Sequence, residues 1–296
     1  MQTVKANGIE LAYETFGKKT DPPMLLIMGL GTQMIAWPDQ LCRDLADRGF
    51  WVVRYDNRDV GLSTHLQEKG IPSLFGVGVR RASPPYTIQD MADDAVGLMN
   101  ALGMESAHVV GASMGGFIAQ TLAIGHPHRI RSLTLIMTST GAQLVGNPKP
   151  SVFSRLTKRR VVADRLSAQE ALVETFRLIG SKGYAFDEEY LMDLGGRSYD
   201  RGVDGGGYMR QLAAITRQPD RSAQLRQLRI PSLVIHGLHD PLVATSGGLA
   251  IAKNLRNAKF VGYSGMGHDL PRALWPEFAR EIAALAEGAE AARRAG

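Results

Sequence analysis

The chain has 296 residues, of which 44% are hydrophobic and 21% charged, and its formal net charge is +5. This length allows one large core or a core with a smaller inserted unit, and the composition excludes a disordered or fibrous protein. No run approaches the roughly 20 apolar residues of a membrane span, and the first residues lack the apolar stretch of a signal peptide. With Cys42 as its single cysteine, we expect a cytoplasmic protein that does not bind a membrane.

Basic side chains gather in the middle of the chain and at its end. A basic patch can attract acidic substrates or nucleic acid, but solvated helix faces and a frayed tail explain the same pattern. Because no zinc-ligand spacing or aromatic RNA-binding motif accompanies the charge, we expect no nucleic-acid partner. The basic residues are Arg155, Lys158, Arg159, Arg160, Arg165, Arg293 and Arg294.

Short hydrophobic runs recur along the chain and predict strands. The first two form a hairpin, since Asn7 and Gly8 separate β-prone runs between Val4 and Phe16. The later runs are continuously apolar, which is typical of strands buried on both faces of a mainly parallel sheet. These strands are expected over residues 23–28, 50–55, 107–110, 133–137, 232–235 and 259–261.

Helical patterns lie between most of these runs. The clearest has a capping box of Thr87 with Asp90, apolar residues at helical spacing and a stop at Gly103. The alternation of strands and helices predicts a doubly wound α/β sheet. Helices between and after the strands are expected over residues 38–47, 88–102, 114–126 and 275–286.

The alternation breaks between Gly141 and Arg226. Residues 168–178 have helical spacing, residues 205–207 are all glycine, and no convincing strand is present. Because strands resume afterwards, we predict a helical cap over residues 141–226, inserted into a core formed by residues 1–140 and 227–296.

A G-x-S-x-G motif spans Gly111 to Gly115 and has Ser113 at its centre. It follows a predicted strand and precedes a helical run, which is the setting of a nucleophile elbow. The sharp turn exposes the serine hydroxyl, and small residues two positions away on each side let neighbouring backbone approach. We therefore predict that Ser113 is a nucleophile.

A serine nucleophile needs a base, and the base needs an acid that orients it. On this kind of sheet the chain order is serine, acid, histidine. Asp240 and His268 follow Ser113 in that order, each directly after a predicted strand. Both therefore fall at the carboxyl edge of the sheet, where open α/β sheets place their sites.

Other candidates fit these roles less well. His236 and His239 share a turn with Asp240 and are expected to bond to backbone or to be structural. Asp269, next to the predicted base, is expected to cap a helix, and residues 137–141 hold no carboxylate that could act instead. The histidines without a surrounding motif, expected in the core or on the surface, are His65, His108, His126 and His128.

The oxyanion of a tetrahedral intermediate needs two preorganised amide donors. One is expected from the backbone N–H of Met114, the residue after the nucleophile. The other is expected in the glycine-rich turn of residues 29–32, after the first buried strand. The alternative is that residues 29–32 form an ordinary strand-to-helix loop. The predicted triad is the reason to favour an oxyanion hole instead.

In this order, the motifs resemble the α/β-hydrolase superfamily over nearly the whole chain. The second donor of that family follows a His-Gly pair, and Met28-Gly29 stands at this place, so the resemblance implies Leu30 as the donor. Residues 55–63 are similar to the family's D-x-R-G-x-G-x-S turn, with Asp59 in place of the first glycine. The resemblance implies that the charges of this turn are structural and pair beneath the site.

Within the superfamily, four short segments resemble aclacinomycin methylesterase and its relatives. That group implies cleavage of a carboxylic ester without metal or cofactor. The similarity weakens across the cap, so it implies a reaction type and not a substrate. The segments are Met28-Gly29, Trp37-Pro38, residues 54–59 and residues 265–268.

Together these features predict a serine esterase that hydrolyses a small-molecule carboxylic ester through an acyl-enzyme. Ser113 attacks, His268 shuttles the proton, Asp240 orients the imidazole, and the amides of Leu30 and Met114 hold the oxyanion. The predicted cap excludes water from an apolar acyl pocket.

The same triad would serve a lactonase, thioesterase, C–C hydrolase or cofactor-free perhydrolase. The fold also serves as a ligand-binding receptor, which is the non-enzymatic alternative. An epoxide hydrolase or dehalogenase would carry aspartate in place of Ser113. The sequence leaves the substrate and the oligomeric state open. Cap residues that either line the pocket or pack in the interior are Phe153, Ile179, Tyr208 and Met209.

Overall fold

A single eight-stranded sheet forms the centre of the protein in a computed structural model that describes residues 1–73, 83–152 and 162–295. The strand order is β1-β2-β4-β3-β5-β6-β7-β8. The first two strands and the β2–β4 pair are antiparallel, and all later pairs are parallel. The predicted mostly parallel, doubly wound sheet is therefore confirmed.

All the predicted strands are present. The hairpin turn has Asn7 and Gly8 at φ 49° and 80°, as its Asn-Gly sequence requires. The strands are β1 (Gln2–Ala6), β2 (Ile9–Phe16), β3 (Pro23–Ile27), β4 (Trp51–Tyr55), β5 (Ala107–Ala112), β6 (Ile130–Ile136), β7 (Ser232–Gly237) and β8 (Ala258–Tyr263).

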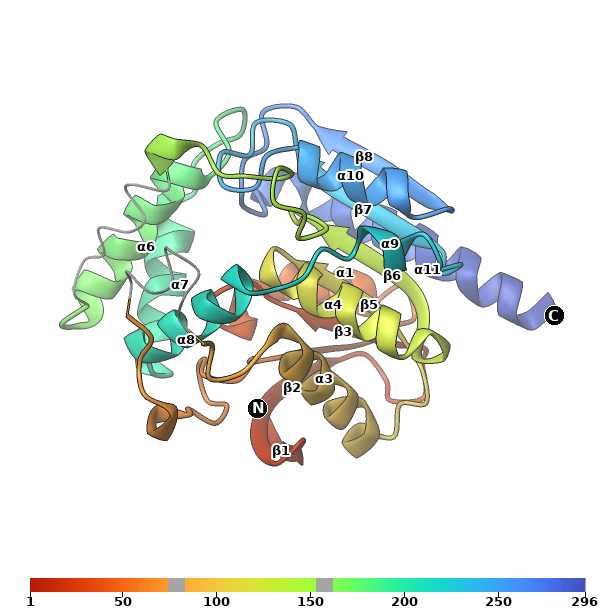
Figure 1. Ribbon diagram of the computed structural model, residues 1–296, viewed down its shortest axis with the longest axis horizontal. Coiled ribbons are helices and arrows are strands. Elements are labelled where there is room, and N and C mark those ends of the chain that lie inside the picture. Colours follow the sequence, from red (N-terminus) through yellow and green to blue (C-terminus); the bar gives the residue numbers. More distant parts are fainter. Residues whose placement is uncertain (74–82, 153–161, 296) are drawn as a thin grey trace.

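Helices cover both faces of the sheet (Figure 1). One apolar core lies under α3 (Ile88–Leu102), α4 (Met114–Gly125) and α10 (Ser246–Asn254). The other lies under α1 (Asp39–Ala46) and α11 (Trp275–Ala295). The capping box of Thr87 and the left-handed Gly103 at the end of α3 are as predicted.

The last helix is longer than predicted, because α11 continues to Ala295 instead of ending near residue 286. The added segment is rich in alanine, glutamate and arginine, which favour helix. Ala289 is buried, and Glu290 pairs with Arg131 at 3.0 Å, so tertiary contacts support this extension.

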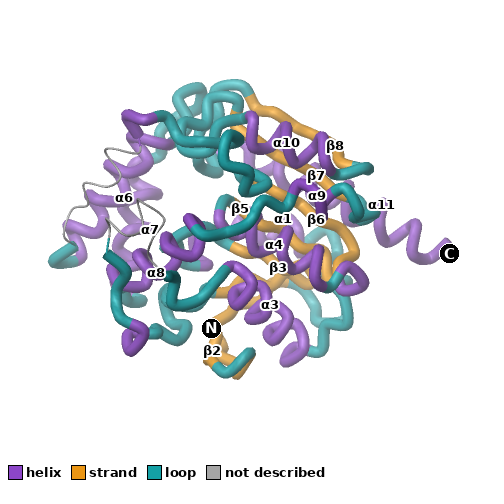
Figure 2. The backbone as a smooth tube through the Cα atoms, in the orientation of Figure 1, coloured by secondary structure: helices purple, strands orange, loops and turns teal. Residues whose placement is uncertain are grey.

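The break between β6 and β7 is filled by helices, which confirms the predicted helical insertion. Figure 2 shows α6, α7 and α8 as a group of helices at one end of the sheet, while α9 packs beside α10 and α4. The boundaries 141–226 stay a prediction. The helices are α6 (Arg165–Ile179), α7 (Glu188–Asp200), α8 (Gly205–Thr216) and α9 (Ser222–Leu225).

The glycine run predicted within the insertion forms the first turn of α8. A Cβ on Gly207 would lie 2.8 Å from the Cβ of Asp59, so glycine lets this helix approach the turn after β4. The insertion is therefore packed directly on the core beside the predicted site.

The basic residues do not form one patch in the described part of the chain. Arg165 pairs with Asp200 on α7, and Arg293 and Arg294 are exposed at the end of α11. No helix among the described residues is long and apolar enough to cross a membrane. Arg155, Lys158, Arg159 and Arg160 lie outside the described residues.

The close packing of α4 makes a prediction about two of its glycines. A Cβ at Gly115 would meet the carbonyl oxygens of Ile27 and Met28, whereas one at Gly125 meets nothing within 4 Å. Gly115→Ala should lower the free energy of unfolding by about 1–3 kcal/mol, because backbone must move. Gly125→Ala should leave it unchanged or raise it by up to about 1 kcal/mol. Urea titrations followed by circular dichroism measure both, and equal effects would contradict this packing.

Candidate active site

Ser113 stands at the sharp turn between β5 and α4. Its backbone has φ 54° and ψ −118°, a strained conformation for a residue with a side chain. A Cβ on Gly111 would collide with the backbone of Gly115, and one on Gly115 would collide with Ile27. The predicted close approach of backbone on both sides of the serine is confirmed, and it leaves the serine hydroxyl at the carboxyl edge of the sheet.

Hydrogen bonds join Ser113 to the other two predicted residues. The Oγ of Ser113 lies 3.0 Å from Nε2 of His268, and Nδ1 of His268 lies 2.8 Å from Oδ2 of Asp240. The other carboxylate oxygen of Asp240 accepts from the amides of Leu242 and Val243, both at 2.8 Å. Since Nδ1 donates to the carboxylate, Nε2 is free to accept the serine proton. The geometry suits nucleophile, base and orienting acid.

The neighbouring histidines bond to backbone, as predicted. Nε2 of His236 lies 2.8 Å from the carbonyl oxygen of Val243, and Nδ1 of His239 accepts from the amide of Gly265 at 3.0 Å. Burial lowers the pKa of His236, although its backbone bond and Asp240 oppose this. Among the described residues, the ring that bonds to the hydroxyl of Ser113 is that of His268.

The prediction that Asp269 caps a helix is wrong. Its carboxylate accepts hydrogen bonds from the backbone and side chain of Ser181, in the segment that follows α6. The next helical turn, Arg272–Leu274, starts after Pro271 and has no side-chain cap. A long-range contact with the insertion therefore replaces the local capping role that the sequence favoured.

The two predicted oxyanion donors flank the serine. A Cβ on Gly29 would lie 3.2 Å from Cβ and 3.6 Å from Oγ of Ser113, so the turn after β3 packs against it. Met114 is the first residue of α4, where backbone N–H groups lack helical partners and the helix dipole favours negative charge. Within the described residues, the amides of Leu30 and Met114 have no protein acceptor. Their role in an oxyanion hole stays a prediction.

A glutamine of the insertion forms a hydrogen bond with the turn that carries Leu30. The amide of Gly31 donates to Oε1 of Gln211 on α8 at 2.7 Å, and Nε2 of Gln211 donates to the carbonyl of Arg58 at 2.8 Å. Gln211 is completely buried. Sequence reasoning missed this residue, since one glutamine in a helical pattern carries no local signal.

The charged turn after β4 is paired beneath the site, as the family resemblance implied. Asp56 pairs with Arg201 of the insertion at 2.5 Å, and Arg58 pairs with Asp94 of α3 at 2.6 Å. Asp59 has φ 67°, so aspartate occupies a left-handed position where the family has glycine. Its partners are the side chain of Arg210, the hydroxyl of Tyr86 and the amide of Leu66.

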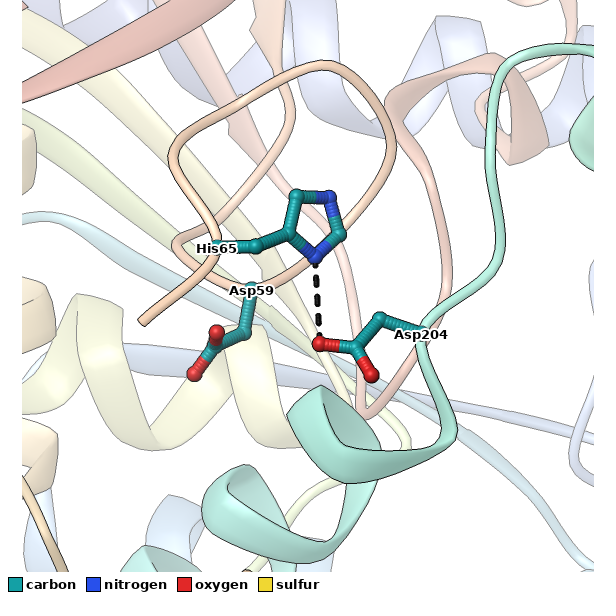
Figure 3. A group of neighbouring side chains, drawn as sticks. All are labelled: Asp59, His65 and Asp204. Carbon is teal, nitrogen blue, oxygen red and sulfur yellow. Dashed lines mark hydrogen bonds and ion pairs between the residues drawn. The ribbon is translucent and has the colours of Figure 1, made fainter. Parts of the chain in front are cut away.

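Three side chains of this region come close enough to resemble a metal site: Asp59, His65 and Asp204 (Figure 3). Nδ1 of His65 points at Asp204, 3.3 Å away. The Arg210 guanidinium lies 2.7 Å from Asp59 and 2.8 Å from Asp204, so a fixed cation already neutralises both carboxylates. The cluster fits a buried ion-pair network, and we assign no metal to it.

An apolar cavity of about 240 Å³ opens on Ser113 and His268. The insertion lines it with Phe176, Ile179, Leu191 and Leu194, among others. A cavity of about 840 Å³ adjoins it and shares lining residues such as Leu30 and Tyr208. Of the cap residues named from the sequence, Ile179 and Tyr208 line the smaller cavity, Met209 lines neither, and Phe153 lies outside the described residues.

Residues 22–271 match the alpha/beta hydrolase fold family. The chain belongs to this family. It is also 28% identical to the rhodomycin D methylesterase DauP of Streptomyces sp. strain C5, over 95% of this chain and 96% of that protein. A putative non-heme haloperoxidase of Mycobacterium phage D29 is 28% identical over 96% of this chain and 93% of its own.

A solved structure has the same fold. The enol-lactonase of Burkholderia xenovorans LB400 superimposes with a TM-score of 0.75 and 24% identity, over 96% of this chain and 99% of that one. Together with the methylesterase match, this confirms the predicted α/β-hydrolase fold and the resemblance to the aclacinomycin methylesterase group.

The ion pair beneath the site makes a prediction about stability. Burial alone would raise the pKa of Asp59, but bonds from Arg210 and Tyr86 hold that pKa below its ordinary value. Arg210→Met leaves the buried carboxylate of Asp59 without its counter-charge, so it should lower the free energy of unfolding at pH 7 by about 3–5 kcal/mol. The exposed Arg165–Asp200 pair provides the control, because Arg165→Met should cost less than about 1 kcal/mol.

The same pair predicts how that loss depends on pH. In the wild type the folded-state pKa of Asp59 lies below its unfolded value of about 3.9, so its pairing stabilises the protein above that value. The contribution disappears as the pH falls through the folded-state pKa. Urea titrations should therefore show a smaller Arg210→Met loss at pH 3 than at pH 7. A loss that stays constant would contradict the pairing.

Proposed function

We propose that this protein is a carboxylic ester hydrolase that acts through an acyl-enzyme on Ser113. The observation that carries the proposal is the hydrogen-bonded chain from Ser113 through His268 to Asp240, which faces an apolar cavity. The turn of Gly29 and Leu30 lies at the other side of the serine. No metal or cofactor is needed for this chemistry, because the side chains supply nucleophile, base and acid.

In the acylation step, Nε2 of His268 takes the hydroxyl proton as Oγ of Ser113 attacks the carbonyl carbon. Asp240 holds the imidazole in the required tautomer and stabilises the imidazolium that forms. The carbonyl oxygen becomes an oxyanion, which accepts hydrogen bonds from the amides of Leu30 and Met114. The imidazolium then donates its proton to the departing alkoxide, so the alcohol leaves and an acyl-serine ester remains.

In the deacylation step, a water molecule takes the place of the alcohol. His268 removes a proton from the water as its oxygen attacks the acyl carbon, and the same amides hold the second oxyanion. Collapse of this intermediate breaks the bond to Oγ, and the imidazolium returns the proton to Ser113. The carboxylic acid leaves, and the enzyme is restored.

Two features support an ester of a small apolar molecule. The cavity beside the serine is lined mainly by apolar side chains, including Met28, Met137 and Phe176. The methylesterase relative matches over nearly its whole length, which supports ester cleavage without defining the alcohol or the acid. Lactone hydrolysis is the cyclic form of the same reaction and uses each step above.

The triad proposal predicts the effect of removing one hydroxyl. Ser113→Ala should reduce hydrolysis of p-nitrophenyl butyrate by about 10³-fold or more, because no nucleophile remains. Ser132→Ala is the matched control, since Ser132 also bonds to a buried histidine, His108 at 2.8 Å, but lines neither described cavity. The control should retain activity within threefold. An unchanged melting temperature with activity retained in Ser113→Ala would overturn the assignment.

The apolar cavity predicts the order of substrates. In a panel of p-nitrophenyl esters, kcat/KM should rise from acetate to a medium-length acyl chain. The reason is that burial of each added methylene in the apolar cavity contributes about 0.8 kcal/mol of favourable free energy. Methyl esters and lactones measured beside them should be cleaved at Ser113, and Ser113→Ala should lose each activity together. If the enzyme cleaves thioesters or carbon–carbon bonds faster than esters, the proposed function would change to thioesterase or C–C hydrolase.

A further inference from the structure

The segment that leaves α6 lies along the loop that carries His268. The backbone N–H of His268 donates to the carbonyl of Ile179 at 2.8 Å. The amides of Lys182 and Gly183 both donate to the carbonyl of Gly265, at 3.1 and 3.0 Å. The insertion thus binds the backbone of the histidine loop at two points, three residues apart.

The side chain of Ser181 binds both neighbours of His268. Its hydroxyl oxygen accepts from the amide of Gly267 at 2.9 Å, and the hydroxyl donates to Oδ1 of Asp269 at 2.5 Å. The backbone amide of Ser181 donates to the same carboxylate oxygen at 3.1 Å. One hydroxyl therefore connects the residues on the two sides of the predicted base.

The contact is tightly packed. A Cβ on Gly267 would lie 2.5 Å from the carbonyl carbon of Gly180 and 2.6 Å from the carbonyl oxygen of Ile179. Ser181 is only 7% exposed, and burial raises the pKa of Asp269, although the two bonds from Ser181 oppose this. Ser181 and Asp269 also line the cavity that contains Ser113 and His268, so this contact lies directly beside the predicted site. A buried polar group that loses its partner costs about 1–3 kcal/mol.

We propose that Ser181 and Asp269 are positioning residues, which hold His268 at the distance and angle that proton transfer from Ser113 requires. The inference rests on the proposed function, since it assigns a role relative to the predicted base. Without the hydroxyl of Ser181, Gly267 loses its acceptor and Asp269 loses a donor. The histidine loop then shifts relative to β5, and displacements near 1 Å at reacting groups cost about 10²-fold in rate.

In this proposal the insertion positions the catalytic base as well as lining the cavity. It lines the cavity through residues such as Phe176, and it also sets the geometry of the base through the segment that follows α6. A shift of the insertion would change both substrate contacts and proton transfer, because the same chain segment carries them.

The chain offers a matched control for Ser181. The amide and hydroxyl of Ser222 both donate to Oδ1 of Asp220, at 2.9 and 2.6 Å, so the same two Ser–Asp hydrogen bonds form in an exposed turn away from the histidine loop. Ser181→Ala should lower kcat for a p-nitrophenyl ester by about 10- to 100-fold and change KM by less than threefold. Ser222→Ala should change both by less than threefold. Asp269→Asn keeps an acceptor oxygen for Ser181, so its kcat should lie closer to wild type than that of Asp269→Ala.

The proton that His268 shares with Asp240 gives an independent readout. Its downfield NMR resonance should shift or broaden in Ser181→Ala and stay in place in Ser222→Ala, whereas a purely structural role would lower only the melting temperature. A kcat within twofold of wild type in Ser181→Ala, or an equal loss in Ser222→Ala, would overturn the positioning role. Ser113→Ala measured beside them separates the cases, since activity retained there would overturn the proposed function itself.

Discussion

The strained turn at Ser113 is the constraint on which the rest of the site depends. It exists because the backbone of β3, β5 and α4 meets with no room for side chains at Gly111 and Gly115. The turn lifts the hydroxyl to the carboxyl edge of a parallel sheet, where the ends of β7 and β8 bring Asp240 and His268 within hydrogen-bond reach. The favourable packing of the surrounding core thus stabilises the unfavourable backbone conformation of Ser113.

The insertion completes this arrangement from the other side. Arg210 neutralises the left-handed Asp59, Gln211 binds the turn after β3, and Ser181 binds the loop that carries His268. The side chains of Arg210, Gln211 and Ser181 are buried, and each contact joins residues that are far apart in sequence. The helices over the sheet therefore act as part of the scaffold of the site as well as the lining of its cavity, which explains why α8 begins with glycines that permit close contact.

The fold and the proximity of Ser113, Asp240 and His268 could be predicted because their signals are local. These signals are apolar runs for buried strands, a motif around Ser113, and an acid and a histidine that each follow a strand. The contacts of Ser181 and Gln211 could not, because they depend on how the insertion packs, and no spacing or motif marks them. Asp269 shows the limit most clearly. Its position before a helical turn favours capping, yet a distant serine binds its carboxylate instead.

The central claim is that Ser113 is the residue that becomes acylated, with His268 as its base. Treatment with a fluorophosphonate followed by mass spectrometry of the digested protein tests it most directly, because the reagent forms a stable adduct with an activated serine. We expect one adduct, on the peptide that contains Ser113, and at least a hundredfold slower labelling in folded His268→Ala. An adduct on another residue, or no adduct on the folded wild-type protein, would contradict the claim.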